Sequence, residues 1–136
     1  MAATKIVHVS GKRKEAVARA TARPGNGIIK INSIPLDLYE PEFARLRLRE
    51  PLLIAGPMAA DVNIDINVVG GGWSSQAEAA RLAIAKALVA FTGSESLKKT
   101  FIDYDRFLMV ADTRRKEPKK AGTHSRARAK RQKSYR

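Results

Sequence analysis

The sequence predicts an α+β fold, in which a mostly antiparallel sheet carries its helices on one face. Residues 15–23 alternate between alanine and larger or charged residues, which is typical of a half-buried strand. Residues 62–68 alternate between branched apolar and polar residues, which predicts a second such strand. Residues 75–92 instead have apolar residues at the spacing of an amphipathic helix. Because each strand has one apolar face, we expect helices to cover one side of the sheet.

The first third of the chain predicts further strands and a tight turn. Residues 5–10 are β-branched with polar alternates, and residues 28–34 predict a returning strand. The Pro-Gly-Asn-Gly sequence at 24–27 lies before that strand, and Asn-Gly tolerates the positive φ angles of a tight turn. We therefore expect residues 15–23 and 28–34 to form a hairpin.

Two weaker helical segments flank the second strand and the longer helix. Residues 36–58 predict an interrupted helix, in which Phe43 and Leu46, with Leu48 as a further member, give the apolar spacing and Pro51 breaks the run. A short helix is expected over residues 94–102. These segments complete the helical layer.

The longer helix has start and stop signals of its own. Ser75-Gln76-Ala77-Glu78 matches a capping box, in which Ser75 accepts a hydrogen bond from the third helical N–H and Glu78 reaches back. Gly93 suits the C-terminal cap. The many alanines allow the helix to approach the alanine face of residues 15–23 closely.

The positive charge is concentrated at the C-terminal end. The chain has 26 Lys and Arg against 13 Asp and Glu, a formal net charge of +13. Residues 113–136 contain 11 of these cations and one acid, Glu117, and they lack Leu, Ile, Val, Phe, Met and Trp. Such a segment buries too little apolar surface to offset the entropy of ordering its backbone. We expect a globular body over 1–112 and an extended basic tail over 113–136 that is disordered alone in solution.

The composition restricts the classes of function. Without cysteine, a disulfide framework, a cysteine zinc site and thiol catalysis are excluded. Only His8 and His124 have imidazole side chains that could act as a general base near neutral pH, and neither has a neighbouring nucleophile and acid. Asp61 and Asp65 favour solvation or pairing with cations over metal binding. The sequence predicts no enzyme, no metal, no cofactor and no small-molecule substrate.

The charge indicates the kind of partner. An excess of +13 is not needed for folding and causes self-repulsion, so it points to a polyanion. No apolar run reaches the roughly 18 residues of a membrane span, and residues 1–10 lack the apolar core of a secretory signal. A basic amphipathic helix for an anionic membrane is also missing. We expect a soluble intracellular protein with a nucleic-acid partner and no membrane.

Three consecutive glycines precede the longer helix. A helix N-terminus has unpaired N–H groups and partial positive charge, and glycines let a phosphate approach it without obstruction by Cβ. A simple strand-to-helix turn explains the glycines equally well, and only the overall charge favours a phosphate site. The donors expected there belong to Gly70, Gly71, Gly72, Ser74, Ser75 and Gln76.

A second basic cluster lies between the first two strands. Lys12, Arg13 and Lys14 follow Gly11 at a predicted loop tip, from which side chains can reach into a groove. Arg19 and Arg23 continue along one strand face. A solvated run of charge is the alternative explanation.

Several motifs resemble those of one known family. They are Ser-Gly-Lys-Arg-Lys-Glu-Ala-Val-Ala-Arg-Ala at 10–20, Pro-Gly-Asn-Gly at 24–27, Ile-Asn-Ser-Ile-Pro at 31–35, Gly-Gly-Gly-x-x-Ser-Gln at 70–76 with its alanine spacing, and Tyr135-Arg136. Together they resemble the ninth protein of the small ribosomal subunit, in its archaeal and eukaryotic form. The resemblance covers essentially all 136 residues.

The resemblance implies a fold and a place. The fold is the one shared with the second domain of ribosomal protein five, with a left-handed β-α-β crossover where the general rule is right-handed. The place is the cytoplasmic ribosome, in the head of the small subunit, on the 3′ major domain of its RNA and beside neighbouring head proteins. The tail would reach the transfer RNA in the peptidyl site. The bacterial branch has a basic residue where this chain has Tyr135, so that role depends on the charge of Arg136.

We therefore predict two sets of contact residues and keep two rival functions. The rivals are an enzyme acting on RNA and a general DNA-compacting protein. The residues predicted to bind ribosomal RNA are Lys12, Arg13, Lys14, Arg19, Arg23, Gly70, Gly71, Gly72, Ser74, Ser75, Gln76, Arg114, Arg115, Lys116, Lys119, Lys120, Arg126, Arg128 and Lys130. The residues predicted to contact transfer RNA are Arg131, Lys133, Tyr135 and Arg136.

Overall fold

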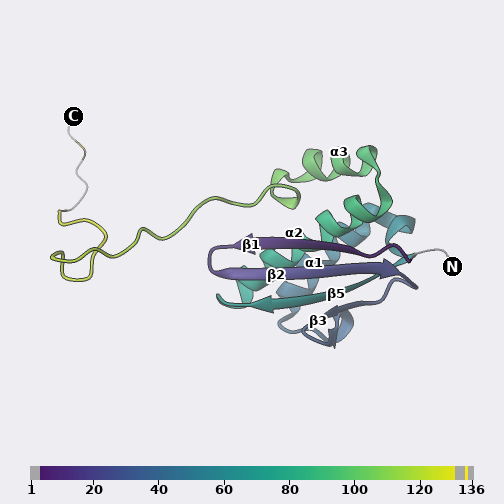
Figure 1. Ribbon diagram of the computed structural model, residues 1–136, viewed down its shortest axis with the longest axis horizontal. Helices are drawn as coiled ribbons and strands as arrows, with labels where there is room; N and C mark the ends of the chain where they lie inside the picture. Colours follow the sequence, from purple (N-terminus) through teal and green to yellow (C-terminus); the bar gives the residue numbers. More distant parts are fainter. Residues whose placement is uncertain (1–3, 131–133, 135–136) are drawn as a thin grey trace.

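A five-stranded sheet forms one layer of the protein (Figure 1). The computed structural model describes residues 4–130 and 134. The strand order is β1-β2-β5-β3-β4, and every neighbouring pair is antiparallel except β3 and β5. The strands are β1 (Val7–Arg13), β2 (Ala16–Pro24), β3 (Ile29–Ile31), β4 (Ile34–Pro35) and β5 (Val62–Val69).

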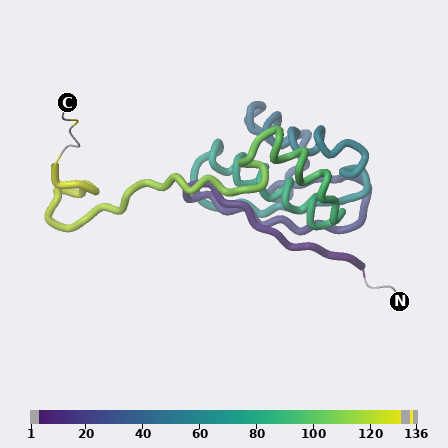
Figure 2. Tube along the Cα trace, turned by 90° about the horizontal axis from the view of Figure 1, so that it is seen from above, coloured from purple at the N-terminus to yellow at the C-terminus, as the bar shows by residue number. Residues whose placement is uncertain are grey.

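Three helices form the second layer, on one side of the sheet (Figure 2). They are α1 (Glu42–Ala55), α2 (Trp73–Thr92) and α3 (Glu95–Tyr104), with short 3-10 turns η1 (Leu36–Leu38), η2 (Gly56–Ala59) and η3 (Arg106–Leu108). Helix α2 packs on β1, β2 and β5, while α1 and α3 pack on α2. This arrangement confirms the predicted α+β class with a mostly antiparallel sheet. Within residues 4–130 and 134, no helix is both long and apolar enough to cross a bilayer.

Small residues bring α2 close to the sheet, as the alanine pattern predicts. Ala16, Ala18, Ala20 and Ala22 are at most 1% exposed beneath the helical layer. A Cβ added to Gly11 in β1 would lie 2.3 Å from the carbonyl oxygen of Ala79 in α2. Gly11 is therefore a packing residue.

The predicted loop tip at residues 11–14 is largely strand. The β1–β2 ladder continues as far as the pair Arg13 and Ala16, so the turn contains only Lys14 and Glu15. Lys14 has a positive φ of 52°. The turn is shorter than predicted from the run of cations at 12–14, because Lys12 and Arg13 still pair with β2.

The predicted hairpin of residues 15–23 and 28–34 is wrong, because β5 lies between β2 and β3. The Oδ1 atom of Asn63 in β5 accepts hydrogen bonds from the backbone N–H groups of Asn26 and Ile28, both at 2.9 Å. The turn at 24–27 is thus held against a third strand. A turn motif predicts only the local backbone conformation. It does not predict whether the two flanking strands pair with each other or with a third strand between them. The parallel pair β3 and β5 is joined through α1, and the left hand of this crossover stays a prediction.

Helix α1 differs from its prediction in two ways. Pro51 lies inside the helix and is buried, so it does not break the run. Phe43 and Leu46 are 75% and 51% exposed, whereas Ala44 and Leu48 are buried. The apolar residues of this helix occupy two sides, and α2 covers only one of them.

Helix α2 begins earlier than the predicted capping box. Its N-cap is Gly72, without a side-chain cap, so Ser75 lies in the first turn. Glu78 forms ion pairs with Arg13 and Arg47 instead of reaching back. The predicted C-cap is confirmed, since Gly93 is left-handed with φ 67°.

Candidate nucleic-acid interface

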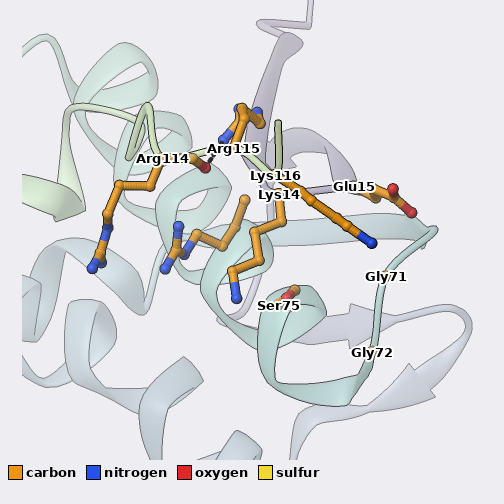
Figure 3. Close-up of a pocket in the computed structure, with 9 residues that line it drawn as sticks. Lys14, Glu15, Gly71, Gly72, Ser75, Arg114, Arg115 and Lys116 are labelled. Carbon is orange, nitrogen blue, oxygen red and sulfur yellow. Dashed lines mark hydrogen bonds between the residues drawn. The ribbon is translucent and has the colours of Figure 1, made fainter. Parts of the chain in front are cut away.

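Three segments that are distant in the sequence surround one pocket of about 650 Å³. They are the β1–β2 turn, the start of α2 and the first residues of the tail (Figure 3). Its lining residues are Arg13, Lys14, Glu15, Gly71, Gly72, Ser75, Arg114, Arg115 and Lys116. The structure thus brings together cations and glycines that the sequence analysis placed in separate clusters. We call this the tip pocket.

The cations of the tip pocket outnumber its carboxylates. Glu15 is the one acidic residue among those that line it. Within the described part of the chain, Lys14 and Lys116 make no ion pair, and both are exposed. The Arg115 guanidinium donates to the carbonyl oxygens of Asp112 and Arg114, each at 2.9 Å, so its charge is not neutralised. The tip pocket therefore presents net positive charge to solvent.

The three glycines have different roles. Gly70 and Gly71 have φ angles of 79° and 65°, and a Cβ on Gly70 would lie 2.4 Å from the Glu15 carbonyl oxygen. These two glycines are explained by the turn and its close packing. Gly72 has φ −101°, and a Cβ added there would meet nothing within 4 Å. Gly72 thus leaves open space in front of the first N–H groups of α2, which have no partner within a helix.

Two other predicted donors at this helix differ in their surroundings. The side-chain amide of Gln76 donates to the Gly70 carbonyl oxygen at 3.1 Å, which stabilises the turn. Ser75 lines the tip pocket, whereas Ser74 does not. Ser75 is the hydroxyl group that the structure places beside the pocket cations (Figure 3).

Arg13 points to the helical side of the sheet. It faces Ala16 across the ladder, on the same side as the buried alanines, whereas its neighbour Lys12 faces the open side. Its Nε atom donates to Glu78 Oε2 at 3.0 Å, and its side chain is 14% exposed. Its Nη1 atom lies 3.1 Å from Asp112 Oδ2, an ion pair without good hydrogen-bond geometry. Arg13 thus forms ion pairs with two acids of the protein itself, Glu78 and Asp112.

Asp112 marks the point where the tail leaves the body. It is 8% exposed, and it accepts hydrogen bonds from the Arg114 guanidinium and from the Arg114 backbone N–H, the latter at 2.9 Å. These bonds from Arg114, with a smaller effect of the Arg13 charge, hold the pKa of Asp112 well below its usual range. Sequence reasoning missed the ion pairs of Asp112 and Glu78. Asp112 precedes a run of cations, which is a usable signal, whereas Glu78 meets Arg13 only in the folded chain.

The open face of the sheet carries further cations. Arg19 and Arg23 project from β2 on the side without helices, and both are exposed. Arg23 lies 3.9 Å from Asp65, so its charge is partly neutralised. His8 on the same face bonds to Thr21 through Nδ1 at 3.0 Å, which fits its predicted role as a strand residue. This face is separate from the tip pocket.

The tail extends away from the body (Figure 1). Arg128 donates to Glu117 at 3.0 Å, which lowers the pKa of that carboxyl. The predicted contacts at Arg131, Lys133, Tyr135 and Arg136 lie outside the described residues. The remaining tail cations, all exposed, are Lys119, Lys120, Arg126 and Lys130.

A compact α+β body with a cationic pocket and a long basic tail defines a class of proteins built to contact a polyanion. The family model for ribosomal protein S9/S16 matches residues 11–136. Two relatives named small ribosomal subunit protein uS9, from Methanococcus maripaludis strain C5 and Methanococcus vannielii, are 52% and 50% identical over 133 residues, covering 97% of this chain and 99% of each relative. The chain belongs to the ribosomal protein S9/S16 family. It is therefore a structural, non-enzymatic ribosomal protein of the cytoplasm, as the motifs implied.

Proposed function

We propose that the body binds small-subunit ribosomal RNA through the tip pocket and that the tail follows the RNA backbone. The convergence of Lys14, Arg115 and Lys116 around one pocket supports this most strongly. A phosphate seated there would meet three cations, the Ser75 hydroxyl and the first N–H groups of α2. Charge-assisted hydrogen bonds to phosphate are stronger than neutral ones, so this pocket suits the backbone of a folded RNA.

The tail supports a contact of low sequence specificity. Tyr135 is its one aromatic residue available for stacking, so the tail can read few bases by stacking. The entropy of ordering such a segment is offset by many charge-assisted contacts when it binds. We infer that the tail passes between RNA helices and neutralises phosphates that repel each other.

The proposed site of binding is the head of the small subunit, on the 3′ major domain of its RNA and next to other head proteins. The end of the tail is proposed to contact the transfer RNA in the peptidyl site. Deleting Tyr135 and Arg136 is then expected to leave the protein in the subunit and to speed transfer RNA dissociation. Equal dissociation rates from subunits that contain either form would remove the transfer RNA role.

A competition titration tests RNA binding against the rivals. Labelled 3′ major-domain RNA is bound to the protein and competed with unlabelled RNA or with duplex DNA of equal length. We expect the RNA to compete roughly tenfold better, because the tip pocket and tail fit a folded backbone. Equal competition would favour a general DNA-compacting protein, and cleavage of the RNA in magnesium would favour an enzyme.

A further inference from the structure

A second pocket, of about 400 Å³, lies at the opposite edge of the sheet from β1. Its walls come from the start of β3, from β4 with η1, and from the second half of α1. Apolar side chains dominate the lining, namely Ile28, Ile29, Pro35, Leu36, Leu52 and Leu53. We call it, together with the exposed Ile34 and Leu38 near it, the apolar patch.

Large apolar side chains of the patch are exposed to solvent. Leu53 is 79% exposed and Leu38 is 70% exposed, while Ile28 and Ile34 are 50% and 45% exposed. Exposed apolar groups gathered around a pocket are typical of an interaction surface. By contrast, Leu48 on the same helix as Leu53 is fully buried in the core.

The charge of this region is unlike that of the rest of the chain. Residues 27–60 contain four cations and four acids, so they are neutral on a chain of +13. Arg49 pairs with Asp37 at 2.7 Å, and Arg45 donates to the Asp37 carbonyl oxygen at 3.2 Å. Arg49, the cation that lines this pocket, is thus neutralised by Asp37, which lines it as well. A surface that binds RNA would present unpaired cations, as the tip pocket does.

We propose that the apolar patch docks an apolar helix or loop of a neighbouring protein in the small subunit; this rests on the proposed function. A neutral apolar pocket is complementary to an apolar side chain, and burying such a side chain stabilises a protein contact. Addition of a strand to β4 is disfavoured, because this edge strand has two residues and one of them, Pro35, has no N–H. A second copy of this chain is disfavoured by the repulsion between two proteins of +13.

Photo-cross-linking in the assembled subunit tests the proposal. Leu53 is replaced by the photoreactive p-benzoylphenylalanine, which its exposure permits, and small subunits that contain this form are purified and irradiated. The matched control places the same group at Tyr104, which is 60% exposed on α3. We expect the adduct at position 53 to be mainly a protein of the small subunit other than this chain, and that adduct to be absent at position 104.

Every other result overturns the proposal. An RNA adduct at position 53 would make the patch an RNA contact, an adduct with a second copy would make it a self-association surface, and no adduct would leave it uncovered in the subunit. A native protein that never enters the subunit would overturn the proposed function as well. If the free protein binds RNA normally but position 53 gives no adduct in the subunit, docking at the patch is overturned and the proposed RNA binding is retained.

A charge-neutral variant adds a second measurement. The double substitution Leu38→Gln and Leu53→Gln is compared with Tyr104→Gln for the fraction of protein retained in subunits after a high-salt wash. We expect a several-fold loss for the double variant and no loss for Tyr104→Gln, with the RNA affinity of the free proteins unchanged. Equal retention of the two variants would contradict docking at this patch.

Discussion

The Nη1 atom of Arg13 lies 3.1 Å from Oδ2 of Asp112, so the end of the β1–β2 hairpin is joined to the segment that leads into the tail. The same guanidinium bonds to Glu78 in α2. One side chain thus connects the sheet, the helical layer and the base of the tail. These contacts set the direction in which the tail leaves the body beside the tip pocket.

Arg13→Leu is expected to lower the free energy of unfolding by about 1–3 kcal/mol, since Glu78 and Asp112 would keep their charges without this partner. Denaturant unfolding of the purified protein measures the loss. Lys12→Leu is the matched control, because Lys12 faces the open side of the sheet, and it should change stability by no more than about 0.5 kcal/mol. Equal effects of the two substitutions would contradict a structural role for Arg13.

The lowered pKa of Asp112 predicts how its contribution depends on pH. A carboxyl whose pKa is lower in the folded state stabilises fully above its unfolded pKa, about 3.9, and loses this effect as the pH falls toward the folded value. The difference in unfolding free energy between the native protein and Asp112→Asn should therefore be constant above about pH 5. It should shrink on acidification, as measured by denaturant unfolding at several pH values. A difference that grows on acidification would contradict a lowered pKa of Asp112 in the folded protein.

Gly72 allows a test of phosphate binding that changes charge alone. Asp and Asn are both good N-caps, and the space in front of Gly72 accepts either side chain. Gly72→Asp is expected to weaken binding to the 3′ major-domain RNA roughly tenfold, because it places a carboxylate in the tip pocket. Gly72→Asn should weaken binding less than Gly72→Asp, because its side chain also occupies the space in front of the first N–H groups of α2 but adds no charge. Both variants should melt at least as high. Equal RNA affinities of the native protein and Gly72→Asp would indicate that the glycines serve only the strand-to-helix turn and not a phosphate site.

Gly71→Val is not a clean test of the same site. Its φ of 65° disfavours a branched residue, and its Cβ would lie 3.1 Å from the Cβ of Ala16. We expect this substitution to reduce stability as well as RNA affinity. Thermal melting beside the binding titration separates the two effects.

Ala80 tests the close packing of α2. It is 1% exposed, so Ala80→Leu should cost roughly 1–3 kcal/mol by forcing bulk into an interface of small residues. Ala90 is exposed on the same helix, and Ala90→Leu is expected to be close to neutral. Thermal melting of both variants measures the difference, and an unchanged melt for Ala80→Leu would contradict the packing.

Local periodicity was sufficient to predict the central strands and the long helix. The alternation in β2 and β5 and the stripe of α2 each report directly which face is buried, so Ala18, Ile64 and Ile84 are in the core as expected. Strand order is different, because it depends on contacts between distant segments. The Asn63 side chain that holds residues 26 and 28 against β5 gives no signal in the turn itself.

The candidate site was only partly predictable for a similar reason. A run of cations shows that charge is present, but the pleat of β1 decides which member faces solvent and which faces an acid. Arg13 and Lys12 are adjacent in sequence and lie on opposite sides of the sheet. Lys14 and Lys116 line the same pocket because the start of the tail lies beside the β1–β2 turn. Only the tertiary structure shows this.

The salt dependence of RNA affinity tests the central claim most directly. The full chain is compared with a form that ends at Lys116, which keeps Arg114 on Asp112 and removes eight cations at 119–136. Each lost phosphate contact should flatten the log–log slope of the binding constant against salt by about 0.7–0.9. We predict that the shortened protein, shown by its melt to be folded, has a slope flatter by several such steps. An unchanged slope would contradict the account of the tail as a phosphate-binding segment.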